Sequence, residues 1–136
     1  MGESRRIRRV LALTALGVLG ARAVVALGDT TATWLSETSG DWSNAALWST
    51  SPNYPNNGSP AGVNYQALFN ATGGTPYTAT IDSDIALDGI TVNSADATVD
   101  QTAGTVQAAT IAVSNGDYQM DGGTLANTSL NVSGGR

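Results

Sequence analysis

The chain has 136 residues with neither cysteine nor histidine, which excludes a disulfide framework and any thiolate or imidazole metal site. Its formal net charge is −5, yet five of its six basic residues lie in the first 22 positions. The remainder, residues 29–136, carries one arginine against ten carboxylates and lacks the basic patch that nucleic acid requires. The length allows one domain at most, and 16 glycines among many Thr, Ser, Asn and Ala residues favour narrow stacked coils.

Residues 1–28 have the pattern of a signal peptide. An apolar stretch over residues 10–20 is followed by small residues, and we expect cleavage between Ala23 and Gly28. A membrane anchor is the alternative, because residues 10–27 approach the length that crosses a bilayer, but Arg22 interrupts that stretch. We therefore expect export, by a Sec or a twin-arginine route. The positively charged start consists of Arg5, Arg6, Arg8 and Arg9.

All three tryptophans lie in residues 29–64, which we expect to form an N-terminal cap module. Asp41 or Ser43 is placed to cap a single helical turn over residues 44–48, and a loop rich in Pro, Asn and Gly follows. The tryptophans either close one end of a repeat stack, where a terminal unit must hide its apolar face, or stack on the rings of a glycan. The first interpretation is favoured for Trp34, Trp42 and Trp48.

Strand periodicity begins at Tyr65. Residues 65–69 and 77–81 alternate between apolar and polar side chains, as half-buried strands do. A turn is expected at residues 82–84. The next side chains expected to point into the core are those of Ile85, Leu87, Ile90 and Val92.

Carboxylates cluster around that turn, in the segment DSDIALD. Oxygen ligands of this kind suit a hard cation such as Ca²⁺, so a metal site is a weak candidate here. Aspartate also favours turns for its own reasons, and we prefer that interpretation. The residues concerned are Asp82, Asp84 and Asp88.

Residues 98–116 and 117–135 are two copies of one nineteen-residue repeat. Five paired positions are identical, and the apolar residues of each copy alternate as in a strand. A fixed period near twenty indicates a solenoid, in which each repeat buries its apolar face against the next. The identical pairs are Gly104/Gly123, Thr105/Thr124, Val113/Val132, Ser114/Ser133 and Gly116/Gly135.

These patterns predict an all-β fold. We expect a right-handed, single-stranded parallel β-helix of about three short coils in residues 65–136. The Trp-rich cap of residues 29–64 precedes it, and a signal peptide helix over residues 1–28 comes first.

The motifs resemble the start of bacterial secreted proteins that carry autotransporter-associated β-strand repeats on a pectin-lyase-like β-helix. The resemblance covers about residues 32–136 and implies a secreted or cell-surface β-helix of a bacterium, with no defined catalytic residues. Members of that family are generally longer, so we expect this chain to be an N-terminal part, truncated at its C-terminus. The matching residues are Trp34, Gly40, Trp42, Ser43, Ala45, Trp48, Asn57-Gly58, Ala67, Phe69 and Gly122-Gly123-Thr124-Leu125.

The function we expect is that of an exported structural or adhesive surface protein, without catalysis of its own and without a cofactor. Without histidine or lysine, the chain offers little that could serve as a general base. A carbohydrate-binding module that uses the tryptophans, or the remnant of a polysaccharide-active β-helix enzyme, are the alternatives.

Two kinds of partner are expected. One is a cell-surface polysaccharide, and the other is a set of further copies or coils at an open C-terminal edge. Contact with a membrane is expected only through the signal peptide during export. The open edge follows from the second repeat copy, which is as apolar as the first and has no polar capping segment. Its inward residues are Tyr118, Met120, Leu125, Leu130 and Val132.

Overall fold

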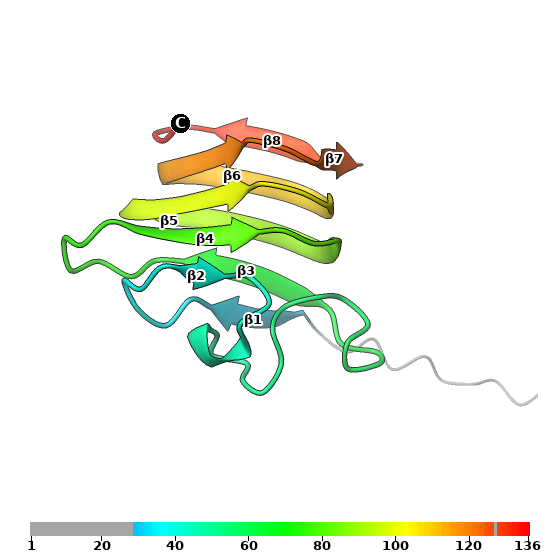
Figure 1. Ribbon diagram of the computed structural model, residues 1–136. Coiled ribbons are helices and arrows are strands. Elements are labelled where there is room, and N and C mark those ends of the chain that lie inside the picture. Colours follow the sequence, from blue (N-terminus) through cyan, green and yellow to red (C-terminus); the bar gives the residue numbers. More distant parts are fainter. Residues whose placement is uncertain (1–28, 127) are drawn as a thin grey trace, which may run out of the picture.

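The structure, a computed structural model, describes residues 29–126 and 128–136. The predicted signal peptide, residues 1–28, lies outside the described residues. The described chain winds into a parallel β-solenoid of about three turns, which confirms the predicted fold class. Figure 1 shows the coils stacked one on another, from β1 at one end to β7 and β8 at the other.

The strands are short at both ends of the stack and long in its middle. The longest, β5 and β6, bend round the corners of the coil, so each of them pairs with several shorter strands. One 3₁₀ turn, η1, follows the first two strands. The elements are β1 (Thr30–Thr33), β2 (Gly40–Asp41), η1 (Ala45–Leu47), β3 (Tyr65–Phe69), β4 (Tyr77–Ile81), β5 (Ile85–Gln101), β6 (Thr105–Met120), β7 (Thr124–Ala126) and β8 (Ser129–Val132).

From β3 onwards a complete coil has three sheet segments, and the same segment of successive coils forms one side of the stack. The first side is built by β1, β3, the middle of β5, the middle of β6, and β8. The second is built by β2, β4 and the ends of β5 and β6. The third is built by the starts of β5 and β6 and by β7. All these pairs are parallel, as coils wound in one sense require.

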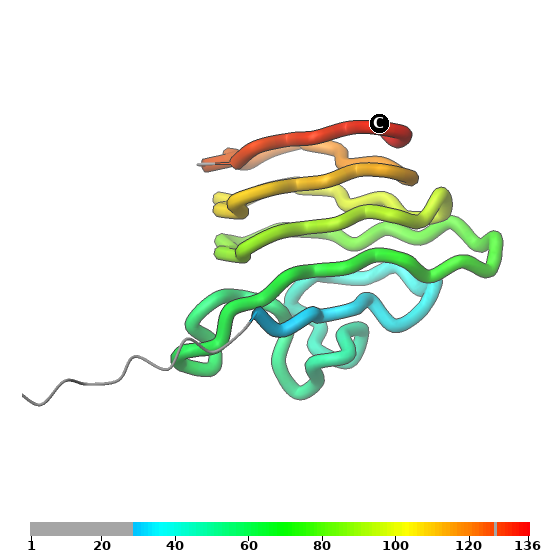
Figure 2. Tube along the Cα trace, turned by 180° about the vertical axis from the view of Figure 1, so that it is seen from behind, coloured from blue at the N-terminus to red at the C-terminus, as the bar shows by residue number. Residues whose placement is uncertain are grey.

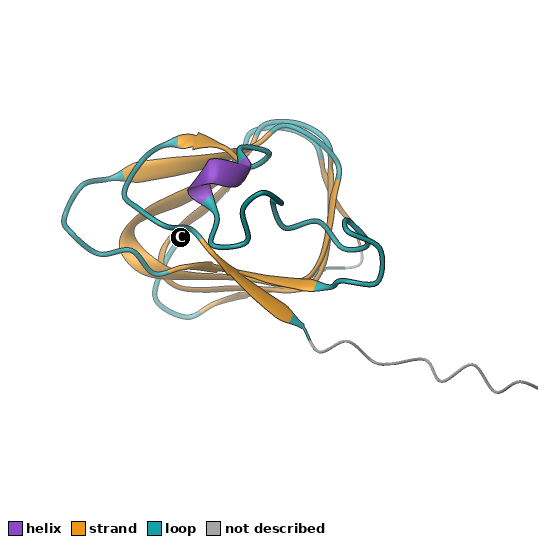
Figure 3. Cartoon of the chain, turned by 90° about the horizontal axis from the view of Figure 1, so that it is seen from below, coloured by secondary structure: helices purple, strands orange, loops and turns teal. Residues whose placement is uncertain are grey.

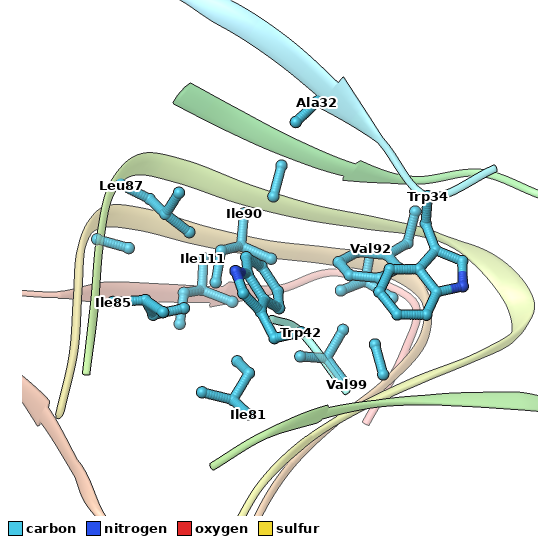
Figure 4. Close-up of a cluster of buried hydrophobic side chains, with 14 of the residues drawn as sticks. Ala32, Trp34, Trp42, Ile81, Ile85, Leu87, Ile90, Val92, Val99 and Ile111 are labelled. Carbon is cyan, nitrogen blue, oxygen red and sulfur yellow. The ribbon is translucent and has the colours of Figure 1, made fainter. Parts of the chain in front are cut away.

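The register confirms the repeat. The last coil pairs with the one below it at an offset of nineteen residues, as the sequence predicted, and residues 85–92 pair with residues 106–113 at an offset of twenty-one. Apolar side chains therefore stack in columns inside the solenoid, where neighbouring coils bury them (Figure 4). Two such columns are Ile90, Ile111 and Leu130, and Val92, Val113 and Val132.

Glycine allows the chain to bend inside β6. Gly116 has a φ of 87°, a left-handed conformation that other residues adopt at a cost. A Cβ atom there would overlap the carbonyl oxygens of Ser94 and Ala97 in the coil below. The Asn115-Gly116 pair thus forms a corner within one continuous strand.

The cap module is continuous with the coils. Strands β1 and β2 pair in register with β3 and β4, so residues 29–41 already form part of the first coil. The predicted helical turn is shorter than expected and is a 3₁₀ turn, η1. Neither Asp41 nor Ser43 caps it: the side chain of Asn44 accepts the hydrogen bond from the backbone N–H of Ala46. Asp41 lies in β2 instead, where pairing with β4 fixes its backbone.

Candidate functional site

The three tryptophans form one buried cluster at the N-terminal end of the stack. The rings of Trp34 and Trp48 meet edge to face with centroids 4.9 Å apart, and those of Trp42 and Trp48 lie 4.7 Å apart. Phe69 packs against all three, with centroids 5.5 to 5.9 Å away. Figure 4 shows Trp34 and Trp42 among the aliphatic side chains of the core.

Each indole N–H of this cluster donates a hydrogen bond to a backbone carbonyl. Trp34 donates to Thr38, Trp42 to Pro55 at 2.9 Å, and Trp48 to Trp42 at 2.8 Å. The polar edge of every ring is therefore satisfied within the protein. Stacking on a sugar needs an exposed ring face, and the structure places all three rings in the core instead. This arrangement is that of a cap.

The cap also covers the backbone edge of β1. Trp34 forms an antiparallel bridge with Trp48, and the N–H of Ser49 donates to the carbonyl of Thr33 at 2.9 Å. The N–H of Leu35 donates to the carbonyl of Leu47, also at 2.9 Å. In Figure 3, η1 and the loop that follows it lie across the middle of the coil. The cap thus bonds the Thr33 end of β1 and covers the aromatic side chains at this end of the stack.

The structure gives two of the three carboxylates proposed as weak metal ligands a role in the fold. Asp84 accepts a hydrogen bond from the N–H of Thr105 at 2.7 Å and so fixes the start of β6. Asp88 accepts one from the side-chain amide of Asn57 at 2.8 Å, which ties the cap loop to β5. Asp82 is exposed in the turn between β4 and β5. Within residues 29–126 and 128–136, no three His, Cys, Asp or Glu side chains converge in a way that could hold a metal ion.

A carboxylate clamp that the sequence did not predict holds the loop between β3 and β4. Glu37 accepts hydrogen bonds from the backbone N–H groups of Gly73, Gly74 and Thr75. Asp96 accepts a further one from Gly74 at 3.1 Å. Such a run of N–H groups forms a nest for an anion, and here the protein's own carboxylates occupy it. The Glu37 contacts span more than thirty residues and follow no period, so periodicity could not predict them.

A shallow groove runs beside the cap loop, over the third side of the stack. Two adjoining hollows of about 310 and 280 Å³ share Ala86 and Gln107. Several polar groups along it already serve the fold: Asn56 accepts from the N–H of Ala86 at 3.0 Å, and Asn57 accepts from the N–H of Tyr65 at 2.7 Å. The groove is therefore best explained as the seam where the cap loop meets the coils.

The last coil is the part of the described chain whose inward side chains are uncovered. Leu130 is 52 % exposed, Val132 47 % and Met120 48 %, although each continues a column that is buried in the coil below. Figure 2 shows this coil in red at the end of the stack opposite the cap loop. The only strand that β7 or β8 pairs with is β6, so the other edge of each has no strand partner among the described residues. This surface is the strongest candidate for a functional site.

No helix in residues 29–126 and 128–136 is long and apolar enough to cross a membrane. No protein-family model, no curated protein and no solved structure matches this chain.

Proposed function

We propose that the chain is a structural module of an exported surface protein, without catalysis of its own. Its Trp-rich end starts a coil stack, and its last coil receives further β-strands. The export-signal pattern of residues 1–28 supports the location of this module outside the cell. The motif from Gly40 to Trp48 and the Gly-Gly-Thr-Leu repeat support kinship with bacterial proteins that carry autotransporter-associated β-strand repeats.

A change in burial along the inner columns carries this proposal. Ile111 and Val113 are buried, whereas Leu130 and Val132, one coil further, are about half exposed. An inward side chain of a solenoid is buried by the coils on both of its sides, and a terminal coil has a neighbour on one side only. A further coil would cover these side chains and pair with the free edges of β7 and β8.

The backbone at Arg136 is already placed to continue the stack. Its N–H donates to the carbonyl of Gly116 at 3.0 Å, and its carbonyl accepts from the N–H of Tyr118 at 2.7 Å. Arg136 thus stacks on Asp117, which precedes it by nineteen residues. Asp117 stacks on Thr98 at the same spacing. A strand that continued from this position would enter the second side of the stack in register.

The test is to append a copy of residues 99–116 directly after Arg136. Arg136 then occupies the first position of the added coil, which Thr98 occupies in the repeat. The chain has no cysteine, so the single substitution Val132→Cys reports on the open end through its rate of thiol labelling in dilute protein. We expect the appended coil to lower that rate towards the rate of the buried reference Val113→Cys and to raise the melting temperature.

Two controls make the result specific. Leu35→Cys, at an exposed position of the cap, should label at the same rate with and without the added coil. An appended segment of the same composition in scrambled order should protect nothing. Unchanged labelling of Val132→Cys beneath the correctly ordered coil would contradict the proposal.

A further inference from the structure

We infer that Asn115 is a site of spontaneous deamidation, and that the isoaspartate formed there loosens the corner of the solenoid at Gly116. The sequence contains two Asn-Gly pairs, Asn57-Gly58 in the cap loop and Asn115-Gly116 in β6. Glycine favours the reaction in both, because it has no side chain to hinder the approach of its backbone nitrogen to the asparagine. The fold holds the two pairs differently, so one chain provides both the site and its control. The inference goes beyond the proposed function and does not depend on it.

The pair in the cap loop is held against reaction. The side-chain amide of Asn57 donates a hydrogen bond to Asp88 at 2.8 Å, and its oxygen accepts one from the N–H of Tyr65 at 2.7 Å. The backbone N–H of Gly58, which belongs to the nitrogen that would have to attack, donates to the carbonyl of Val63 at 2.8 Å. Reaction at Asn57 therefore requires a local opening that breaks all three hydrogen bonds.

The pair in β6 is held much less firmly. Asn115 is exposed, and its amide donates to the side-chain oxygen of Asn93 at 2.9 Å, which is exposed as well, so water competes for this bond. The ladder between β5 and β6 is irregular on both sides of this pair and resumes at Thr98 and Asp117. Gly116 has no partner residue in β5. Regular pairing therefore does not fix the torsion that brings its backbone nitrogen to the side chain before it.

The reaction needs only water from outside the chain. The backbone nitrogen of Gly116 gives up its proton and bonds to Cγ of Asn115. The bond from Cγ to Nδ2 breaks, and Nδ2 leaves with that proton as ammonia. Water then opens the cyclic imide at one of its two carbonyl carbons. Opening at Cγ gives aspartate, whereas opening at the main-chain carbonyl gives isoaspartate, whose main chain is longer by one carbon atom.

The corner has little room for a longer main chain. A Cβ atom at Gly116 would overlap the carbonyl oxygens of Ser94 and Ala97, so the two coils approach closely there. The additional carbon atom of isoaspartate displaces Gly116 from this position. Deamidation also removes the donor of the hydrogen bond to Asn93 and leaves two oxygens facing each other. Both changes weaken the contact between β5 and β6.

The test of the site is to keep the folded chain in warm, mildly alkaline buffer and to follow both asparagines by mass spectrometry of peptic peptides. Digestion at acid pH stops the reaction. We expect Asn115 to form aspartate and isoaspartate at least about tenfold faster than Asn57. In guanidinium chloride, which breaks the hydrogen bonds that hold Asn57, the two rates should become similar. Asn115→Gln should abolish the reaction at this position, because the longer side chain closes a ring much less readily.

Three results would overturn the site: no conversion of Asn115, equal rates at the two asparagines in the folded chain, or a ratio of rates that denaturation leaves unchanged. The last would mean that the neighbouring sequence, and not the fold, determines the difference.

The loosening of the corner is tested on the separated products. Asn115→Asp is the matched control, because it carries the same charge as the isoaspartyl form on an unaltered main chain. We expect the melting temperature to fall from the parent chain to Asn115→Asp, and to fall further in the isoaspartyl form. An isoaspartyl form that melted together with Asn115→Asp would overturn the effect on the corner.

Discussion

At the scale of single residues, Gln101 is the unusual member of the core. It is fully buried and lies in a column between Ile81 and Met120. Its side-chain amide donates to the carbonyls of Gly104 and Thr124, at 3.2 and 3.1 Å. Its oxygen accepts from the hydroxyl of Tyr118 at 3.0 Å. An apolar residue would fill the same space, but the hydrogen bonds of the amide also fix the position and register of the next coil relative to this one.

Two tyrosines make the stability of the chain sensitive to alkali. Burial raises the pKa of both Tyr118 and Tyr77 above the ordinary value of 10.0. Below about pH 10 both phenols are protonated in the folded and the unfolded chain, and their contribution is constant. Above it the unfolded chain releases protons that the folded chain keeps, so the free energy of unfolding falls as pH rises.

Urea unfolding, measured at several pH values from about 8 to about 11, tests this effect. Tyr118→Phe removes one of the two phenols, so its stability should fall less steeply above pH 10 than that of the parent chain. At neutral pH the same variant should lose about 1–3 kcal/mol, because the buried oxygen of Gln101 loses its partner. Equal slopes for the two proteins would show that the phenol of Tyr118 is not held neutral by the fold.

Alanine substitutions at Gly116 and Gly58 distinguish the two costs of a side chain at a positive φ, which are backbone strain and overlap with neighbouring atoms. Both have a left-handed backbone, with φ of 87° and 81°, but a Cβ atom at Gly58 meets no other atom within 4 Å. Gly58→Ala should therefore cost about 1–2 kcal/mol for the backbone alone. Gly116→Ala should cost about 3 kcal/mol or more, since it also overlaps Ser94 and Ala97. Equal losses in thermal and urea unfolding would mean that the coils do not approach closely at this corner.

At the scale of elements, the cap is the part of the structure on which the coils depend. Trp42→Ala removes a buried ring that packs against Trp48 and Phe69, and should lower the free energy of unfolding by about 3–5 kcal/mol. Leu35→Ala, an exposed residue of the same module, should change it by no more than about 0.5 kcal/mol. If Trp42→Ala melted like the parent chain, the cluster would not be a cap.

Local periodicity predicted the strands well where each coil repeats its predecessor. The bounds of β3 and β4, the turn at residues 82–84 and the register of the last three coils all agree with the structure. An alternating apolar pattern defines which side chains point inward, and the fixed period defines which of them stack. The open last coil was predictable for the same reason, because its inward residues match those of the coil below.

The cap was less predictable, because its contacts do not repeat. From β3 onwards, paired residues of successive coils lie nineteen to twenty-three positions apart, but the first coil runs from Thr30 to Tyr65. The additional length forms η1 and the closing loop, and no period indicates where that loop folds. The Glu37 clamp, the Asn44 cap and the hydrogen bonds of Asn56 and Asn57 all belong to this irregular part.

At the scale of the whole molecule, the separation of charge along the sequence predicts how the chain is processed. Four arginines precede the apolar stretch of residues 10–20, whereas residues 29–136 are acidic. N-terminal sequencing of material collected outside the cell should therefore begin between Val24 and Asp29. A soluble product inside the cell that retained Met1 would contradict export.

The whole molecule is also asymmetric along its axis, with a cap at one end and uncovered apolar side chains at the other. Most of its interior contacts join β5 and β6 to their neighbours, and the strands of the last coil are paired on one side only. Local opening should therefore be easiest at that coil, because opening it breaks the fewest contacts.

Residue-resolved amide hydrogen exchange is the most direct test of this asymmetry. It should be measured on dilute protein with the parent sequence. We expect the slowest exchange in β4 and the middle of β5, intermediate exchange in β6, and the fastest among the strands in β7 and β8, with β1 protected by the cap. Fast exchange in β1, or protection in β7 and β8 equal to that in β5, would contradict a stack that is closed at its Trp-rich end and open at its last coil.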